Sequence, residues 1–287
     1  MIKRILIIFL VLTGIYIILS NFPVLSWLGF NTDNNQSVKV TERIDSIELQ
    51  TTSMPTTILP EDREDILIDY DGKGTVDINQ KGDSIEIDVK GPRFNFFRFN
   101  RNADLKIYIP KDFNRSMDIT VGSGSLEFSG PSKKNPMKLD ELELNIGSGK
   151  MEIRNVIANA LELNGSSGII NLDSIQVTKG DFEMSSGKMN ISHYIGALEA
   201  EISSGKMNIQ IDELNGHSSL KASSGQINLD LPDDADFTLR GKTSSGRINS
   251  EFELTDGNSN EKELNGQHGT GKYNLDLQVS SGHVRLY

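Results

Sequence analysis

The sequence predicts an all-β protein built as a parallel β-solenoid, in which successive repeats form stacked coils. Three observations support this prediction: a Ser-Gly signature recurs, apolar residues alternate on both sides of it, and equivalent positions carry the same residue type. The clearest copies read FEMSSGKMNI, AEISSGKMNI and LKASSGQINL. A period of about 20 residues in strand-like sequence is typical of architectures in which each unit buries its apolar face on its neighbours.

Nine aligned glycines are expected to mark the corners of the coils. The residue two positions after each glycine is apolar, whereas before the glycine the apolar positions lie three and five residues back. The apolar residues thus lie at odd positions before the glycine and at even positions after it. In a straight strand this switch would turn the apolar side chains to the outer face, so the chain must bend at the glycine. Glycine suits the bend because it accepts positive φ without a Cβ clash. The predicted structural turns are Gly124, Gly149, Gly168, Gly187, Gly205, Gly225, Gly246, Gly271 and Gly282.

A column of asparagines lies three residues after the glycine in most repeats. Stacked coils place equivalent positions one above another, so the amides can form a hydrogen-bonded ladder. An antiparallel meander with each Ser-Gly at a hairpin tip also fits the alternation. However, a meander gives no reason for the same amide at each outward position, so we favour the solenoid. The predicted structural ladder consists of Asn171, Asn190, Asn208, Asn228, Asn249 and Asn274.

The N-terminal sequence predicts a single transmembrane helix. Lys3 and Arg4 precede an apolar segment, and no charge follows until Asp33. A helix of this length can cross one bilayer. The positive-inside rule places the N-terminus in the cytoplasm and the C-terminal domain outside. A cleaved signal peptide is the alternative, but no A-x-A cleavage site follows the apolar core.

The segments between the apolar N-terminus and the first Ser-Gly repeat are strand-like but lack the signature. Since end repeats of a solenoid must be atypical to avoid an open edge, we expect a capping region there. The expected organisation is a cytoplasmic tail at 1–4, a transmembrane anchor at 5–28, a linker at 29–41, an N-terminal β capping region at 42–117 and β-solenoid repeats at 118–287.

The composition excludes several kinds of chemistry. The chain of 287 residues has no cysteine, which excludes disulfides, thiol catalysis and thiolate metal sites. Its formal net charge of −11 and its expected position outside the membrane make nucleic-acid binding implausible. The four histidines show no metal-ligand spacing, so neither a metal nor a cofactor is expected.

We find no catalytic residues in the sequence and expect no enzyme activity. The string from Gly266 to Tyr273 resembles a phosphate-binding loop, but Tyr273 stands where such a loop has Ser or Thr. The residues that follow alternate like a strand, whereas a phosphate loop opens a helix. An envelope polysaccharide-active enzyme is a second hypothesis, but it needs carboxylates clustered on one outward face.

A basic stripe is the one candidate ligand-binding feature. The residue after the corner glycine is cationic in five repeats, and stacked coils would align these side chains about 5 to 10 Å apart. In an acidic chain such a stripe could attract an anionic envelope polymer or lipid headgroups. Alternatively, the lysines only solvate the corner and prevent lateral association. The predicted stripe consists of Lys150, Lys188, Lys206, Arg247 and Lys272.

The sequence resembles a bacterial family called "putative adhesins", a domain of unknown function. The resemblance lies in IDSIELQTTSMPTTILP at 44–60, in ADLKIYIP at 103–110 and in the SSGKMNI and SSGQINL units, and it covers about residues 42–287. It implies a β-solenoid that faces the outside of the membrane, in a membrane-anchored member linked to cell-envelope stress. It implies no enzyme activity and supplies no catalytic residues.

The expected function is therefore non-enzymatic binding or scaffolding in the cell envelope, by a protein held in the cell membrane through one N-terminal span. A third hypothesis is an accessory protein that modulates a neighbouring membrane sensor. The expected partners are the membrane, an anionic polymer or lipid headgroups, and another membrane protein.

Overall fold

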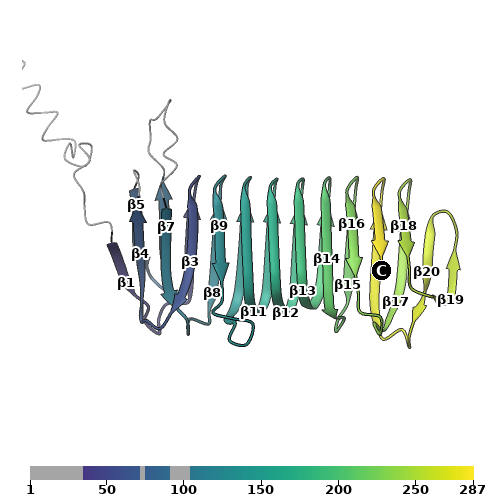
Figure 1. Cartoon of the computed structure of the whole chain (residues 1–287), viewed down its shortest axis with the longest axis horizontal. Helices are drawn as coiled ribbons and strands as arrows, with labels where there is room; N and C mark the ends of the chain where they lie inside the picture. The colour runs from purple at the N-terminus through teal and green to yellow at the C-terminus, as the bar shows by residue number, and fades with distance from the viewer. Residues whose placement is uncertain (1–34, 72–74, 91–103) are drawn as a thin grey trace, which may run out of the picture. The chain divides into compact units, whose positions relative to one another are not determined.

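The computed structural model describes residues 35–71, 75–90 and 104–287, which belong to one compact unit. These residues form β-strands and turns and contain no helix (Figure 1), so the all-β prediction is confirmed. Accordingly, none of the described segments is a helix that could cross a bilayer. The expected tail at 1–4 and anchor at 5–28 lie outside the described residues.

Twenty-two strands make up one continuous sheet. In the first half of the described chain they are β1 (Asn35–Lys39), β2 (Ser46–Thr51), β3 (Pro55–Glu61), β4 (Asp65–Asp71), β5 (Thr75–Lys81), β6 (Ser84–Lys90), β7 (Asp104–Pro110), β8 (Ser116–Val121), β9 (Ser125–Ser129), β10 (Met137–Ile146) and β11 (Lys150–Gly165). In the second half they are β12 (Ile169–Met184), β13 (Lys188–Ile202), β14 (Lys206–Glu213), β15 (Ser218–Ala222), β16 (Gln226–Asp230), β17 (Phe237–Thr243), β18 (Arg247–Ser250), β19 (Thr255–Ser259), β20 (Glu263–His268), β21 (Tyr273–Val279) and β22 (His283–Leu286).

Most strands belong to one of two parallel ladders that meet at the turns. The strands that run into a turn form the leading ladder, in the spatial order β6, β2, β8, β10, β11, β12, β13, β15, β21 and β17. The strands that leave a turn form the trailing ladder, in the order β7, β3, β9, β11, β12, β13, β14, β16, β22 and β18. The long strands β11, β12 and β13 bend and contribute to both ladders. Parallel stacking of solenoid coils is therefore confirmed, and the antiparallel meander is excluded for these strands.

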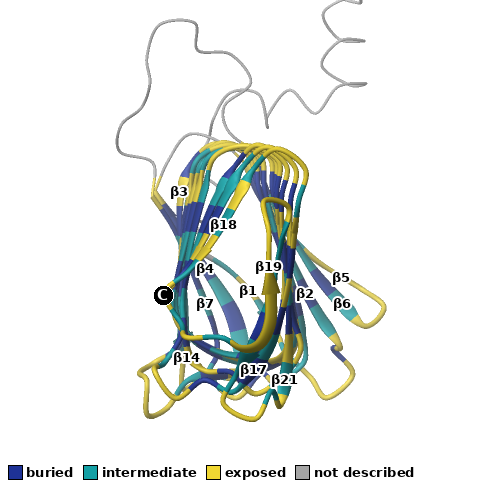
Figure 2. Cartoon of the chain, turned by 90° about the vertical axis from the view of Figure 1, so that its right-hand side faces the viewer, coloured by how far each residue is buried: buried dark blue, intermediate teal, exposed yellow. Residues whose placement is uncertain are grey.

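The core lies between the two ladders because each strand alternates buried and exposed side chains. In β8, Met117, Ile119 and Val121 are buried while the residues between them are half-exposed. Figure 2 looks along the stack and shows buried residues on the ladders and exposed residues at the turns. Each fully buried Ile, Leu, Met or Val stabilises the fold by about 1.5–3 kcal/mol. The repeats thus share one continuous core.

The coils do not stack in the order of the sequence at the C-terminal end. β22 lies between β16 and β18, and β21 lies between β15 and β17. The last repeat of the chain is therefore inserted between two earlier ones. This arrangement differs from the simple succession of repeats that we expected.

The N-terminal region also differs from the expectation. β1 forms within the segment expected to be a linker, because Asn35 to Lys39 pair antiparallel with β4. Strands β2 and β3 of the expected capping region pair parallel with β8 and β9. The coil geometry therefore begins before residue 118, although these strands lack the Ser-Gly signature.

Antiparallel strands close three of the four ladder ends. β5 pairs with β6 at the N-terminal end of the leading ladder, and β4 pairs with β7 on the trailing ladder. At the C-terminal end, β20 pairs with β17 and β19 pairs with β20. The fourth end is β18, which pairs with β22 along one edge. Within the described residues no strand pairs with its other edge.

Candidate functional site

The Ser-Gly corners fix the position of each residue that follows them. Gly168 has φ of +137°, and a Cβ on it would lie 2.6 Å from the carbonyl oxygen of Gly149. The N–H of Ile169 donates to the same carbonyl at 2.9 Å. Glycine is thus required by both the backbone conformation and the close approach of the neighbouring corner. Because corner hydrogen-bonds to corner, the residues after the glycines form a column.

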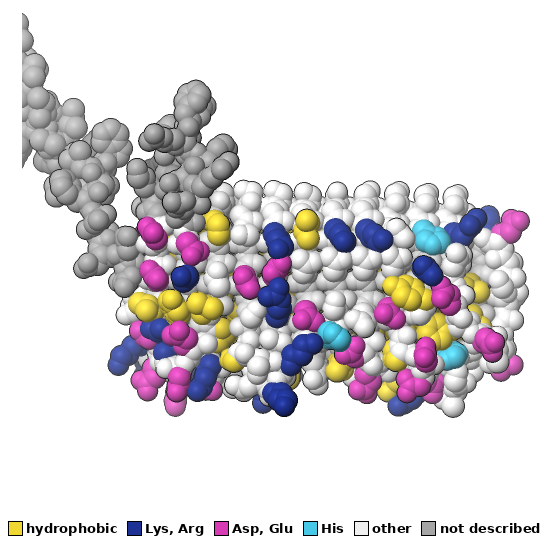
Figure 3. Space-filling view, viewed as in Figure 1, with side chains coloured by type: hydrophobic (Ala, Val, Ile, Leu, Met, Phe, Trp, Pro, Cys, Tyr) yellow, Lys and Arg dark blue, Asp and Glu magenta, His cyan; other side chains and the backbone are white. Residues whose placement is uncertain are grey.

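The structure gives this column an order that differs from the sequence order. Lys188 and Lys206 are direct neighbours in the trailing ladder, and Arg247 lies beside His283. Figure 3 shows the resulting row of cationic side chains along one edge of the face. From β9 to β18 the column reads Ser125, Lys150, Ile169, Lys188, Lys206, Gln226, His283 and Arg247. We call this column the basic stripe.

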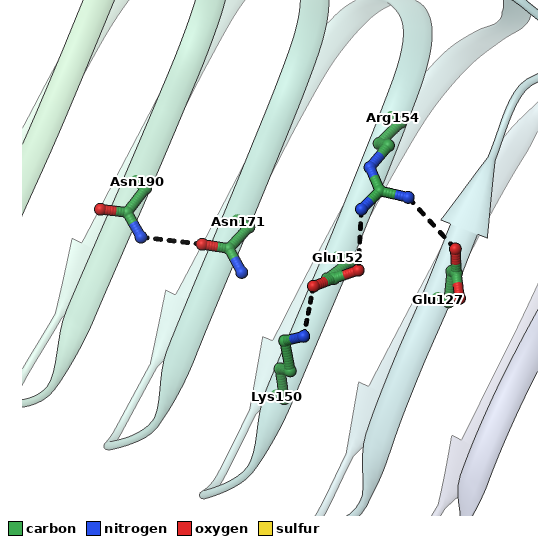
Figure 4. A network of polar contacts seen from close by, with 6 residues as sticks. All are labelled: Glu127, Lys150, Glu152, Arg154, Asn171 and Asn190. Carbon is green, nitrogen blue, oxygen red and sulfur yellow. Dashed lines mark hydrogen bonds and ion pairs between the residues drawn. The ribbon is translucent and has the colours of Figure 1, made fainter.

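Lys150 is bound by a carboxylate and is not available as a free cation. Its ammonium forms an ion pair with Glu152, and Arg154 contacts Glu152 at 2.9 Å and Glu127 at 3.2 Å (Figure 4). The hydrogen bond from Lys150 is the main reason that the pKa of Glu152 is lowered. Within the described residues the ion pairs include neither Lys188 nor Lys206.

Lys188 and Arg247 are exposed and Lys206 is half-buried. Arg247, too, takes part in no ion pair among the described residues. Neighbouring strands of the ladder lie about 4.8 Å apart, so Lys188 and Lys206 place two uncompensated charges side by side. Repulsion between them favours an anion that bridges both. The stripe can therefore present unneutralised positive charge to solvent, at an edge of an otherwise acidic protein.

The structure removes Lys272 and Gly271 from the predicted sets. Gly271 follows β20 and leads into β21, and it lies near Thr238 rather than on another corner glycine. The ammonium of Lys272 lies 4.6 Å from the ring centroid of Tyr273, away from the stripe. The expectation failed because Thr270-Gly271 resembles the Ser-Gly signature but stands just before a strand of the leading ladder, whereas the true corners stand before strands of the trailing ladder. The other eight predicted glycines follow one another in the stack, in the order Gly124, Gly149, Gly168, Gly187, Gly205, Gly225, Gly282 and Gly246.

The string that resembles a phosphate-binding loop has its donors occupied by a carboxylate. The hydroxyl of Thr270 donates to Asp236 at 2.6 Å, and the N–H of Lys272 donates to the same carboxylate at 2.9 Å. The hydrogen bond from Thr270 is the largest cause of the lowered pKa of Asp236. Strand β21 then begins at Tyr273, where a phosphate loop would open a helix. This geometry does not fit nucleotide binding.

Four of the six predicted ladder asparagines are joined by side-chain hydrogen bonds. Asn190 donates to Asn171 at 2.8 Å (Figure 4), Asn208 donates to Asn190 at 2.8 Å, and Asn228 donates to Asn208 at 2.7 Å. Arg285 follows Asn228 in the stack because β22 is inserted there. The ladder therefore ends at Asn228.

The remaining two asparagines stand outside the ladder. Asn249 pairs with Arg285 in the backbone register, and Asn274 lies in the leading ladder opposite Thr238. Asn249 is separated from Asn228 by the inserted strand β22, whereas Asn274 follows Gly271 in a leading strand and therefore lies on the other ladder. A sequence alignment of the repeats shows which positions are equivalent, but it does not show which strands are neighbours.

Sequence reasoning missed a second charged column, which lies on the leading ladder. Seven successive strands carry Asp or Glu at the same outward position. In the strands that lead into a corner glycine, this acidic residue lies six positions before the glycine, so the pattern was present in the sequence. The column reads Glu86, Glu48, Asp118, Glu143, Glu162, Asp181 and Glu199. We call it the acidic column. The acidic column lies on the leading ladder, whereas the basic stripe lies on the trailing ladder.

The carboxylates of the acidic column are only partly compensated. Amides donate to Glu143 at 2.9 Å and to Glu162 at 3.0 Å, and Lys179 lies 3.6 Å from Glu199. The Oδ1 atom of Asp118 is buried and has no hydrogen-bond partner among the described residues. Burial raises the pKa of Asp118, and the charges of Glu143 and Glu48 raise it further. Within the described part of the chain no group of His, Asp and Glu could hold a metal ion.

Comparison with known proteins identifies a family for nearly the whole described unit. The family model Toastrack DUF4097 matches residues 44–287. A comparison with curated proteins gives no significant match.

Two solved structures align with most of this chain at low sequence identity. A "putative adhesin" from Bacteroides fragilis has 12% identity and a TM-score of 0.49, and the alignment covers 88% of this chain and 96% of that one. A "putative adhesin" from Parabacteroides distasonis has 14% identity and a TM-score of 0.48, with coverage of 88% and 96%.

Proposed function

This chain belongs to the Toastrack DUF4097 family, and we propose that it is a non-enzymatic binding protein of the cell envelope. The proposed ligand carries many negative charges and is either a phosphodiester-type envelope polymer or a surface of anionic lipid headgroups. Residues 5–28 would anchor the chain in the cell membrane, with the solenoid outside. The link to envelope stress rests on the resemblance given above.

The observation that carries this proposal is the basic stripe. Lys188 and Lys206 lie on adjacent strands, and Arg247 lies beside His283 further along the stack. A polymer with regularly spaced anions can contact several of these cations at once. The acidic column repels the same polymer from the leading ladder, so binding is directed to one side.

The proposal predicts electrostatic, salt-sensitive binding. Each Lys or Arg near an anionic surface contributes about 1 kcal/mol, so removing three cations should weaken binding on the order of 100-fold. The test uses the full-length chain in detergent micelles, with purified teichoic acid, peptidoglycan and anionic vesicles as probes. Affinity is measured at low and high salt for the variant Lys188→Gln/Lys206→Gln/Arg247→Gln.

A matched control has the same charge change at positions outside the stripe. Lys138→Gln/Lys221→Gln/Lys272→Gln removes three exposed lysines, and it should retain most of the affinity. If both triple variants weaken binding equally, the interaction depends on net charge and the stripe is not a site. If the unsubstituted chain binds none of the three probes, the proposal is wrong.

One observation favours the alternative of an envelope polysaccharide-active enzyme. Glu183 and Glu201 lie on neighbouring strands and line a groove of about 410 Å³ together with Asn145, Asn164 and Ser185. Two carboxylates that face one groove are what glycoside hydrolysis requires. Release of reducing ends from envelope glycans, lost in Glu183→Gln and Glu201→Gln, would support this alternative over pure binding.

A further inference from the structure

The C-terminal end of the trailing ladder carries an open β-edge. Arg247 and Glu251 donate their N–H groups to Gly282 and Leu286, at 3.0 and 2.9 Å, on the side of β22. Because a strand alternates its hydrogen-bonding direction, the N–H and C=O groups of Ile248 and Ser250 point the opposite way. Unpaired edges attract further strands, and natural proteins usually cover them.

Among the four described ladder ends, this one alone lacks an antiparallel strand. The other three ladder ends are each closed by an antiparallel strand, namely β5, β4 and β20. Figure 1 shows the hairpin of β19 and β20 extending past the strand labelled β18 at the same end. The chain therefore continues the leading ladder beyond β18 and leaves the trailing ladder one strand short.

A groove of about 510 Å³ runs along the open edge. One wall is the edge itself, from Gly246 to Asn249, and the other is the hairpin turn from Ser259 to Leu264. Ile248 and Leu264 are half-buried and packed against the core, so they give the groove an apolar strip. The groove thus combines backbone donors and acceptors with apolar contact, as in proteins that bind an extended peptide by strand addition.

The charges of the groove indicate the chemistry of the peptide. Glu261 and Glu263 line the hairpin wall and Arg247 lines the edge wall, so carboxylates outnumber cations in the groove. Within the described residues no ion pair includes Glu261 or Glu263. A peptide with basic residues would neutralise them, whereas an acidic peptide would be repelled. An apolar residue between the basic ones would cover Ile248 and Leu264.

We infer that β18 and the β19–β20 hairpin form a docking groove for an extended, basic segment of a partner protein. The segment adds to β18 as an antiparallel strand and completes the trailing ladder. Its apolar residue packs on Ile248 and Leu264, and its basic residues face Glu261 and Glu263. This groove shares Arg247 with the basic stripe but does not include Lys188 and Lys206, on which the polyanion site also depends.

The experiment uses the full-length chain in detergent and the synthetic peptide acetyl-Thr-Lys-Val-Lys-Val-Lys-Thr-amide. Peptide binding should slow hydrogen exchange at the amides of Ile248 and Ser250. The same peptide with N-methyl groups on alternate residues cannot pair with the edge and should bind at least about tenfold more weakly. Glu261→Gln/Glu263→Gln should weaken binding by about tenfold without disturbing the fold.

Two further variants keep the inference falsifiable. Ile248→Pro removes an outward N–H and should abolish binding, whereas Asn249→Ala changes only an exposed side chain and should not. Lys188→Gln/Lys206→Gln should leave peptide binding unchanged, which separates this groove from the polyanion site.

Equal binding of the plain and N-methylated peptides, or no binding, would overturn the inference. So would a concentration-dependent dimer that Ile248→Pro abolishes, because the occupant of the groove would then be a second copy of this chain.

Discussion

The N–H of His283 donates a hydrogen bond to the carbonyl oxygen of Gly225 at 3.0 Å, although these residues lie in widely separated parts of the chain. On the other side of the same strand, the N–H of Arg247 donates to Gly282 at 3.0 Å. Strand β22 is thus held between β16 and β18, and it links repeats that would otherwise be direct neighbours.

The first prediction concerns this inserted strand. Deleting residues 283–287 should reduce the free energy of unfolding by roughly 3–6 kcal/mol, because it removes two fully buried side chains, Val284 and Leu286. Urea denaturation followed by circular dichroism measures the loss. The control Tyr287→Ala keeps the strand and removes only an exposed ring and its contact with Arg285, so it should change stability by less than about 1 kcal/mol. An unaffected deletion variant would show that β22 is not inserted in the stack.

The second prediction concerns the asparagine ladder. Asn190→Ala removes two amide hydrogen bonds, to Asn171 and from Asn208, and should cost about 1–3 kcal/mol of unfolding free energy. Asn274→Ala, at an exposed position of the leading ladder, should cost less than about 0.5 kcal/mol. Equal effects of the two substitutions would mean that the ladder contributes nothing beyond an ordinary surface amide.

The third prediction concerns the corner glycines. Gly168→Ala places a Cβ 2.6 Å from the backbone oxygen of Gly149, which cannot move without breaking the neighbouring corner. We expect a loss of at least about 2 kcal/mol. Gly82→Ala also requires positive φ, but its Cβ would meet nothing within 4 Å, so its cost should be about 1 kcal/mol. Thermal or urea unfolding measures the loss of stability in both variants. Gly82→Ala reports the cost of backbone strain alone, and Gly168→Ala reports the cost of strain together with a steric clash.

The fourth prediction concerns pH and the acidic column. The raised pKa of Asp118 means that its folded form holds a proton more tightly than its unfolded form. Its contribution to stability is therefore present below the ordinary Asp range and is lost as pH rises through the raised pKa. Asp118→Asn, which cannot ionise, should be more stable than the unsubstituted chain at pH 7, and this advantage should disappear at pH 3.

Glu152 provides a control, because its pKa is shifted in the opposite direction from that of Asp118. Its pKa is lowered by the hydrogen bond from Lys150, so its contribution is present at neutral pH and is lost as pH falls. Glu152→Gln should therefore destabilise the chain at pH 7 and have less effect at pH 3. Urea denaturation at both pH values tests the pair. If Asp118→Asn shows no pH-dependent advantage, neither burial nor repulsion within the acidic column raises the pKa of Asp118.

The equivalence of positions could be predicted from the sequence, but the order of the coils could not. Each Ser-Gly repeat offers the same pattern of backbone and apolar groups to a neighbour. Nothing local therefore distinguishes Gly225 stacking on Gly246 from Gly225 stacking on Gly282. The short interval before Gly282 and the long one before Gly271 were the available signs of irregularity. Long-range pairing decides the order, and it is not encoded within a single repeat.

For the candidate site, too, the sequence predicted which positions are equivalent but not which side chains are neighbours. The column position after the glycine was sufficient to find Lys188, Lys206 and Arg247, but it also admitted Lys272, which lies at a local copy of the pattern. The pairing of Lys150 with Glu152 depends on side-chain conformation and was invisible in the sequence. The acidic column could have been found by aligning the residues six before each glycine, since this alignment shows Asp118, Glu143, Glu162, Asp181 and Glu199.

The most direct test of the proposed function compares Lys206→Gln with Lys272→Gln in the full-length chain. Both substitutions remove one positive charge, but only Lys206 lies in the basic stripe beside Lys188. Binding of purified teichoic acid, measured by titration calorimetry at low salt, should weaken about fivefold for Lys206→Gln and stay unchanged for Lys272→Gln. Equal affinities of the two variants would contradict a polyanion site on the stripe.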